Sequence, residues 1–279
     1  MKVTVDYIKS LKNKRKISML TAYDYTTSII LDNAGIDILL VGDSAGMVML
    51  GYDNTIPVSM EEMLLFCKAV SKGRKRAMVV ADMPFMSYHI DDKSALENAF
   101  KFIKYANVDA VKMEGGKEMS RRIKVLVEAG IPVMAHIGLK PQTATLWHGY
   151  KVHGLTRESA LELLDDAKAL EEAGAFSIVL EQVTFEVAKS ITERLKIPTI
   201  GIGSGNACDG QVLVIHDMLG LYEKLKPRFV KRYAELGKSI DKAVREYIED
   251  INSSNFPSEE HTFYMDEEEY QKFKEIIDG

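Results

Sequence analysis

The stretch Ile36-Asp-Ile-Leu-Leu-Val-Gly42, followed directly by Asp43 and Ser44, shows the pattern that decides the fold. Its almost continuous apolar run is typical of a strand that is buried on both faces, as in a parallel sheet. The amphipathic stretches on either side of it would form the helices that connect one parallel strand to the next. Asp43 and Ser44 then stand where the strand ends.

The same alternation of a short apolar run and a longer amphipathic stretch extends over most of the chain. The candidate strands are Lys16–Ala22, Ile36–Gly42, Arg76–Ala81, Asp109–Glu114, Ile131–His136, Ser177–Glu181, Pro198–Ile202 and Gln211–His216. Between two of them, the capping box Ser59-Met-Glu-Glu62 predicts a helix that runs towards Gly73. Eight such units predict an α/β fold, a closed (β/α)8 TIM barrel, which typically needs about 250 residues. A doubly wound open sheet remains the alternative, because spacing in the sequence does not show closure.

The end of the chain differs from the repeating part. Residues 228–251 are polar and amphipathic, and they predict one or two extra terminal helices after the last strand. From Met265 the composition becomes acidic, which indicates a short docked helix or a frayed tail. We therefore divide the chain into a barrel domain, residues 1–263, and an acidic C-terminal appendage, residues 264–279.

Composition excludes several classes of protein. The 279 residues carry 36 basic and 41 acidic side chains, a net charge of −5, so nothing supports binding to a nucleic-acid backbone. No uninterrupted apolar window of about 18 residues predicts a membrane span. Cys67 and Cys208 are too few for a disulfide framework, and the first residues lack the apolar core of a signal peptide, so we expect a cytoplasmic protein.

Polar residues gather at the predicted carboxyl ends of the strands, where barrel enzymes carry their chemistry. Such side chains are costly to bury unless something pairs with them. The residues are Asp43, Ser44, Asp82, Lys112, Glu114, His136 and Glu181.

If Asp43, Asp82 and Glu114 converge, their mutual repulsion requires a cation, and oxygen ligands of this kind favour Mg²⁺. A 2-oxo acid would chelate that ion through its carboxylate and ketone oxygens, with Lys112 neutralising the carboxylate. The alternative is that each acid caps the helix that follows it, or belongs to an ion-pair network.

Glu181 ends an apolar strand, where desolvation favours the proton affinity that a general base needs near neutral pH. A helix cap or a pair with a neighbouring lysine is the alternative for this residue. His136 is a candidate donor to a substrate oxygen, or a structural histidine. The loop Gly201–Gly210 is too irregular for a dinucleotide fingerprint and indicates close approach of the backbone to a ligand or to the barrel rim.

Several motifs resemble the ketopantoate hydroxymethyltransferase family, in order and at that family's spacing over about residues 1–263. The matching segments are Met19–Asp24, Gly42–Met47, Asp82–Met86, Val111–Gly115, Ala135–Gln142, Leu180–Glu181, Gly201–Gly205, Asp209–Asp217 and Phe256–Phe263. The chain departs from the family pattern at Trp147–Tyr150, where the family has a glycine pair, and at His153, where it has glutamine. Residues 265–279 lie beyond the family's usual end.

The resemblance implies a barrel of the phosphoenolpyruvate/pyruvate superfamily that assembles as a homodecamer. It implies Mg²⁺ contacts from Asp43, Asp82 and, at longer range or through water, Glu114. It also implies 2-oxo acid contacts from Asp43, Ser44, Asp82 and Lys112, with Glu181 as the general base and His136 nearby in the substrate pocket.

The reaction that this resemblance implies is transfer of a hydroxymethyl group from 5,10-methylenetetrahydrofolate to 3-methyl-2-oxobutanoate. A Mg²⁺-dependent C–C lyase or mutase of the same superfamily is one alternative, although we find no Cys-bearing loop of the kind that those enzymes carry. A non-catalytic oligomeric scaffold and a flavin-binding barrel are the others.

Overall fold

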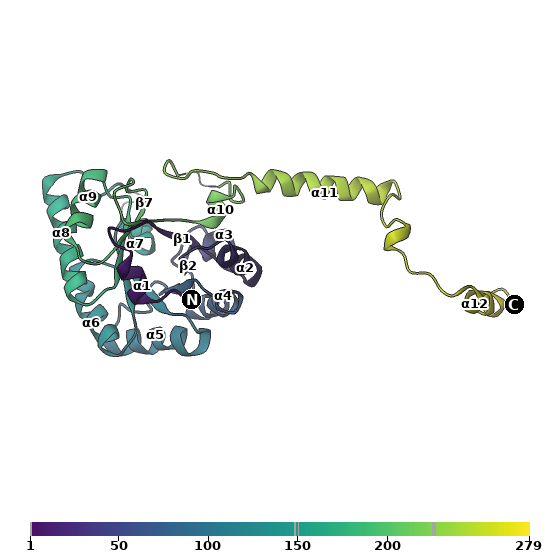
Figure 1. Ribbon diagram of the computed structural model, residues 1–279, viewed down its shortest axis with the longest axis horizontal. Helices are drawn as coiled ribbons and strands as arrows, with labels where there is room; N and C mark the ends of the chain where they lie inside the picture. The colour runs from purple at the N-terminus through teal and green to yellow at the C-terminus, as the bar shows by residue number, and fades with distance from the viewer. Residues whose placement is uncertain (1, 148, 150, 225–226) are drawn as a thin grey trace.

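The computed structural model describes residues 2–147, 149, 151–224 and 227–279, and it contains a closed barrel of eight parallel strands (Figure 1). The strands are β1 (Ile17–Thr21), β2 (Ile38–Val41), β3 (Met78–Asp82), β4 (Ala110–Glu114), β5 (Val133–Gly138), β6 (Ser177–Glu181), β7 (Thr199–Ile202) and β8 (Gly210–Leu213). Each strand pairs with the next along the chain, and β8 pairs with β1 in parallel. The predicted barrel is therefore confirmed, and the open sheet is wrong.

Two layers of apolar side chains follow from the two-residue period of the strands. Ile38 and Leu40 of β2 point into the barrel and pack there with Met78 and Val80 of β3. The alternate residues, such as Leu39 of β2 and Val79 of β3, face outward and pack against the helices. Strands β2 to β6 are therefore buried on both faces, which explains their continuous apolar runs in the sequence, whereas β1 and β8 expose Ser18 and Gln211.

Helices surround the strands and close one end of the barrel. The surrounding helices are α2 (Tyr25–Asn33), α3 (Ala45–Val48), α4 (Met60–Gly73), α5 (Asp92–Ala106), α6 (Ser120–Glu128), α7 (Pro141–Trp147), α8 (Arg157–Glu172), α9 (Phe185–Arg194) and α10 (Ile215–Met218), with a 3-10 turn η1 (Lys117–Met119). The predicted capping box of α4 is present, since Ser59 and Glu62 each accept a hydrogen bond from the other's backbone N–H. At the amino-terminal end of the strands, α1 (Val5–Ser10) buries Ile8, which packs with Val3 and Leu11 under the barrel interior.

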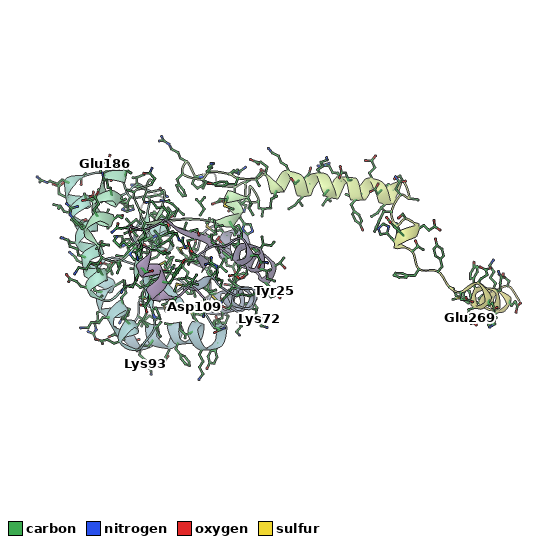
Figure 2. All side chains as sticks on the ribbon, in the orientation of Figure 1. Tyr25, Lys72, Lys93, Asp109, Glu186 and Glu269 are labelled. Atoms are coloured by element: carbon green, nitrogen blue, oxygen red, sulfur yellow. The ribbon has the colours of Figure 1, made fainter. Side chains whose placement is uncertain are left out.

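The C-terminal part of the chain leaves the barrel as an extended arm, which we define as residues 236–279 (Figure 1). It contains α11 (Leu236–Asn252), the 3-10 turn η2 (Glu259–His261) and α12 (Glu267–Ile277). The helix predicted to begin near Arg228 thus begins later, because residues 228–235 run back across the barrel end instead of forming a helix. The appendage does form a helix, but its side chains project outward without packing on the barrel (Figure 2). Within the described ranges, no helix has both the length and the apolar character needed to cross a membrane.

Asp32, near the end of α2, connects this helix to the loop that precedes β3. Its carboxylate accepts backbone hydrogen bonds from Lys75 at 2.9 Å, Arg76 at 3.0 Å and Ala77 at 2.6 Å. Burial alone would raise the pKa of Asp32, but these hydrogen bonds and the Arg76 charge hold it below its usual value. Asp32 therefore stabilises the fold in its ionised form.

We expect Asp32→Ala to lower the free energy of unfolding by about 3 kcal/mol at pH 7, because three backbone N–H groups lose a charged acceptor. Since the folded-state pKa is depressed, this contribution is present above the unfolded-state pKa and disappears as the pH falls through the folded-state value. Urea unfolding at pH 7 and pH 3 measures both effects. Asp53→Ala, at an exposed position, is the matched control, and an equal loss in the two variants would contradict the assignment.

Candidate active site

Five of the predicted polar residues lie together because they continue the inward-facing rows of β3, β4, β5 and β6, whereas Asp43 and Ser44 follow the end of β2. Asp82 follows Val80 at the next inward position of β3, and Lys112 and Glu114 follow Ala110 on β4. All seven predicted site residues line one cavity of about 1310 Å³ at the carboxyl end of the barrel. The expected convergence is therefore confirmed, whereas the individual roles remain predictions.

Lys112 lies at the centre of this cluster. Its Nζ donates to Asp82 Oδ1 at 2.7 Å and lies 4.0 Å from Glu114 Oε1 and 3.2 Å from His136 Nδ1. On the other side of the imidazole ring, His136 Nε2 lies 3.3 Å from Glu181 Oε2. Lys112 and Glu181 thus face the same histidine from opposite sides.

His136 is neutral in this environment. Burial and the nearby Lys112 charge lower the pKa of His136 well below its usual value. The short distances from its ring to Glu114 and Glu181 are therefore contacts of a neutral imidazole and not ion pairs at pH 7. Its Nε2 atom is buried without a hydrogen-bond partner in the described part of the chain, so it remains available to a ligand.

Gln142 joins the two sides of the cluster, although the sequence analysis assigned it no role. Its Nε2 donates to Asp43 Oδ2 and to the Met83 carbonyl, both at 2.9 Å, and its backbone N–H donates to Glu114 Oε2 at 3.2 Å. The side-chain oxygen accepts from the Tyr88 hydroxyl at 2.9 Å. Gln142 is fully buried in the first turn of α7, and its position two residues after Lys140 in a matching family segment was the only signal for it.

Ser44 has a similar unpredicted partner. The Tyr23 hydroxyl and Ser44 Oγ are 2.8 Å apart and share a hydrogen bond. Tyr23 is buried, and burial raises its pKa above the usual value, so the hydroxyl stays protonated. Tyr23 therefore fixes the serine side chain at the cavity wall.

Negative charge exceeds positive charge in the cluster. Burial first, and then repulsion from Asp82, raises the pKa of Asp43 to about 7. Burial raises the pKa of Glu181 to about 7 despite the opposing charge of Lys112, and burial also raises the pKa of Glu114. Burial alone would lower the pKa of Lys112, but its carboxylate neighbours raise it. The cluster is therefore a favourable place for a further cation.

The carboxylate oxygens of the cluster suit a Mg²⁺ ion that is bound partly by water and ligand oxygens. Among the described residues, they do not form a site in which protein ligands alone surround the ion. In the part of the chain that the structure describes, no three His, Cys, Asp or Glu side chains surround a common point as ligands. Asp43 and Asp82 lie at the same mouth, and the Asp43 backbone N–H is 3.4 Å from Asp82 Oδ2. One or two carboxylates completed by water and ligand oxygens are the usual surroundings of Mg²⁺.

The glycine loop after β7 approaches aromatic rings closely. A side chain at Gly203 would meet the Phe229 ring at 2.8 Å, and one at Gly205 would meet the Phe185 ring at 2.6 Å. This is the close approach at the barrel rim that the sequence indicated. His153, one of the departures from the family pattern, donates its backbone N–H to the Gln182 carbonyl at 2.8 Å. The other departure from the family pattern is Trp147–Tyr150, in which His148 and Tyr150 lie outside the described residues.

A family model described as ketopantoate hydroxymethyltransferase matches residues 2–259. The chain belongs to this family. The 3-methyl-2-oxobutanoate hydroxymethyltransferase of Nitrosopumilus maritimus is 56% identical over 98% of this chain and 97% of its own length. The protein of the same name from Carboxydothermus hydrogenoformans is 55% identical over 95% of this chain and 96% of its own length. Membership in this family makes the chain an enzyme, so the non-catalytic scaffold loses its support.

Solved structures show the same fold at low sequence identity. A phosphonopyruvate hydrolase in complex with oxalate and Mg²⁺ has a TM-score of 0.61 at 13% identity and covers 99% of this chain and 97% of its own. A 2,3-dimethylmalate lyase of the PEP mutase/isocitrate lyase superfamily has a TM-score of 0.58 at 17% identity and covers 100% of this chain and 96% of its own. These likenesses show that the ketopantoate hydroxymethyltransferase chain has the same barrel fold as those two proteins.

We expect Lys112→Met to raise the pKa of Glu181 above its present value of about 7, because the Lys112 charge is the strongest influence that lowers it. Infrared titration of the protonated carboxyl band, assigned by its loss in Glu181→Gln, measures this pKa. Lys140→Met removes a more distant and partly exposed charge and is the matched control. An unchanged midpoint in Lys112→Met would contradict the electrostatic account.

Proposed function

We propose that this chain transfers a hydroxymethyl group from 5,10-methylenetetrahydrofolate to 3-methyl-2-oxobutanoate, giving 2-dehydropantoate and tetrahydrofolate. This reaction would serve pantothenate and coenzyme A biosynthesis in the cytoplasm. The observation that carries the proposal is the convergence of Asp43, Asp82, Lys112 and Glu181 in one cavity. The names of relatives that are 50–56% identical over nearly the full chain support it.

Mg²⁺ would be held by Asp43 and Asp82, with Glu114 at longer range or through water, and would polarise the ketone of the 2-oxo acid as a Lewis acid. Lys112 is placed to neutralise the substrate carboxylate beside Asp82. Ser44, fixed by Tyr23, and the unpartnered Nε2 of His136 offer donors to substrate oxygens. The residues of the cavity wall thus bind the polar end of a 2-oxo acid and orient it.

Glu181 is the general base in this proposal. Its side chain is largely buried at the tip of β6, with 14% of it exposed, and its pKa of about 7 lets it accept a proton near neutral pH. Removal of the proton from C3 of the 2-oxo acid makes that carbon a nucleophile. C3 then forms a bond to the one-carbon unit, both bonds from that unit to the N5 and N10 nitrogens of the folate break, and water supplies the hydroxyl group. The proton taken from C3 and one proton of the water end on the two nitrogens, which gives tetrahydrofolate.

The runner-up is a Mg²⁺-dependent C–C lyase or mutase acting on a 2-oxo acid. The fold likeness to a 2,3-dimethylmalate lyase is the observation behind it. Cys67 and Cys208 are both buried, and neither lines the cavity, so no cysteine is placed to protonate a product there. The site therefore favours the transferase over the lyase.

The arm supports the proposal that the enzyme is a homo-oligomer, with ten copies as the number implied by the family resemblance. One face of α11 carries large apolar side chains that are about half exposed in the single chain, including Ile240, Val244, Tyr247, Ile248 and Ile251. Their spacing puts them on a single helical face. An apolar stripe on a helix that projects from the barrel is stable when it packs against another copy.

We expect turnover of 3-methyl-2-oxobutanoate with methylenetetrahydrofolate and Mg²⁺, and its loss with EDTA. Without folate, C3–H exchange into D2O reports the proton removal alone, and its rate should rise with pH to a plateau, with a midpoint at about 7, the pKa of Glu181. Glu181→Gln should slow exchange by roughly 10²–10⁴-fold. Glu186→Gln, five residues along on the exposed face of α9, is the matched control. Full exchange in Glu181→Gln would remove this residue from the role of base, and cleavage of a 2-hydroxy diacid without folate turnover would favour the lyase.

The double variant Ile240→Glu/Val244→Glu should dissociate the oligomer into smaller species, because it places two charges in the apolar stripe of α11. Light scattering coupled to size exclusion measures the mass. Lys242→Glu on the opposite face changes the net charge by the same amount and should leave the mass unchanged. An unaltered mass in the double variant would show that α11 does not contribute to assembly.

A further inference from the structure

The cavity is larger than a small 2-oxo acid requires. At about 1310 Å³ it exceeds the roughly 300–1,000 Å³ that holds a drug-sized ligand. The polar cluster described above occupies the part that β2 to β6 provide. The remaining part, which we call the second compartment, lies at the ends of β7 and β8 and is lined by Gly203, Asn206, Val214, Asp217, Arg228 and Phe229.

The second compartment adjoins the general base. Gln182 directly follows Glu181 in a left-handed conformation with φ of 47°, which an L-residue adopts only at a cost. Its Cγ would lie 3.2 Å from a side chain at Gly203, and the Phe229 ring lies on the same glycine. A ligand packed against the Phe229 ring is therefore close to the residue that removes the substrate proton.

Asp217 is the acidic group of the second compartment, and it has no side-chain partner among the described residues. Its carboxylate makes no hydrogen bond with any residue that the structure describes, and no basic group in the described ranges lies within 4.0 Å of it. Burial raises the pKa of Asp217 to about 6, with the more distant Arg232 opposing the shift, so the group is mostly ionised at pH 7. A half-buried carboxylate of this kind calls for a ligand that donates hydrogen bonds.

The chemistry of the compartment fits the pterin ring of a folate. A 2-amino-4-oxopyrimidine edge presents two parallel N–H donors, the arrangement that a carboxylate accepts in bidentate form. The Phe229 ring, which covers Gly203, provides an apolar surface for a flat heterocycle. Arg228 is exposed at the margin of the compartment and is placed to meet the acidic tail of such a ligand.

We propose that the second compartment seats the pterin of the one-carbon donor, with the Asp217 carboxylate accepting the N3–H and 2-amino hydrogens and Phe229 packing on the ring. This inference rests on the proposed function and specifies which part of the cavity binds the second substrate. Asp217 would bind the folate, whereas the acidic cluster around Lys112 would bind the 2-oxo acid.

Calorimetry with tetrahydrofolate, the unreactive product, tests the assignment. Asp217→Asn should weaken tetrahydrofolate binding by roughly ten-fold or more, because the charged partner of two N–H groups becomes a neutral amide that also presents its own donors. Binding of 3-methyl-2-oxobutanoate with Mg²⁺ should be retained, which shows that the variant is folded. Asp53→Asn, at an exposed position outside the cavity lining, is the matched control.

A second ligand separates direct contact from an indirect structural effect. With an analogue that carries a methyl group in place of the 2-amino group, the native protein should bind more weakly than it binds tetrahydrofolate. The loss of affinity caused by Asp217→Asn should also be smaller than with tetrahydrofolate, because only the N3–H donor remains for the carboxylate. Equal affinity of the native protein for the two folates overturns the assignment without any variant, as does equal affinity of native and Asp217→Asn for tetrahydrofolate. If the native protein binds the 2-oxo acid but no folate and turns over none, it is the proposed function that fails.

Discussion

The buried Lys112 ammonium group is the charge on which the active-site arrangement depends. It bonds to Asp82 and faces Glu114 and His136, so several carboxylates can share a water-poor space without a larger mutual repulsion. Burial first, and then the same charge, lowers the pKa of His136 and keeps it neutral, and the Lys112 charge also holds down the pKa of Glu181. Desolvation acts in the opposite direction on every acid of the cluster. The balance between these two effects leaves Glu181 able to gain and lose a proton near neutral pH.

Closure of the barrel brings these charged side chains together around one cavity. The same two-residue period that fills the interior with Ile38, Leu40, Met78 and Val80 continues at the carboxyl ends with charged residues. A continuous apolar interior thus supports a polar layer that sits on it. The charged side chains of β3, β4 and β6 come from strands that are hydrogen-bonded on both sides, so the barrel sets their positions. Asp43 lies beyond the end of β2 and accepts a hydrogen bond from Gln142.

The sequence predicts those features that depend on one strand and its period. Asp82, Lys112, Glu114 and Glu181 were found in this way, since the carboxyl ends of parallel strands meet at one edge. Gln142 and Tyr23 were not, because their roles arise from hydrogen bonds to residues on other strands, which no local pattern records. The segment 228–235 was misjudged for a related reason. Its helical periodicity is overridden by tertiary contacts, in which Phe229 packs on Gly203 and Tyr233 donates its backbone N–H to the Met218 carbonyl.

The closed amino-terminal end of the barrel limits how small molecules enter and leave the cavity. Val3, Ile8 and Leu11 fill the space beneath the strands, so the cavity opens only at the opposite end as far as the described residues define it. Whatever lies deepest, against Lys112 and Asp82, must then arrive before anything that sits above it and depart after it. The depth of the cavity would therefore fix the order of binding and release, so that the first molecule to bind is the last to leave.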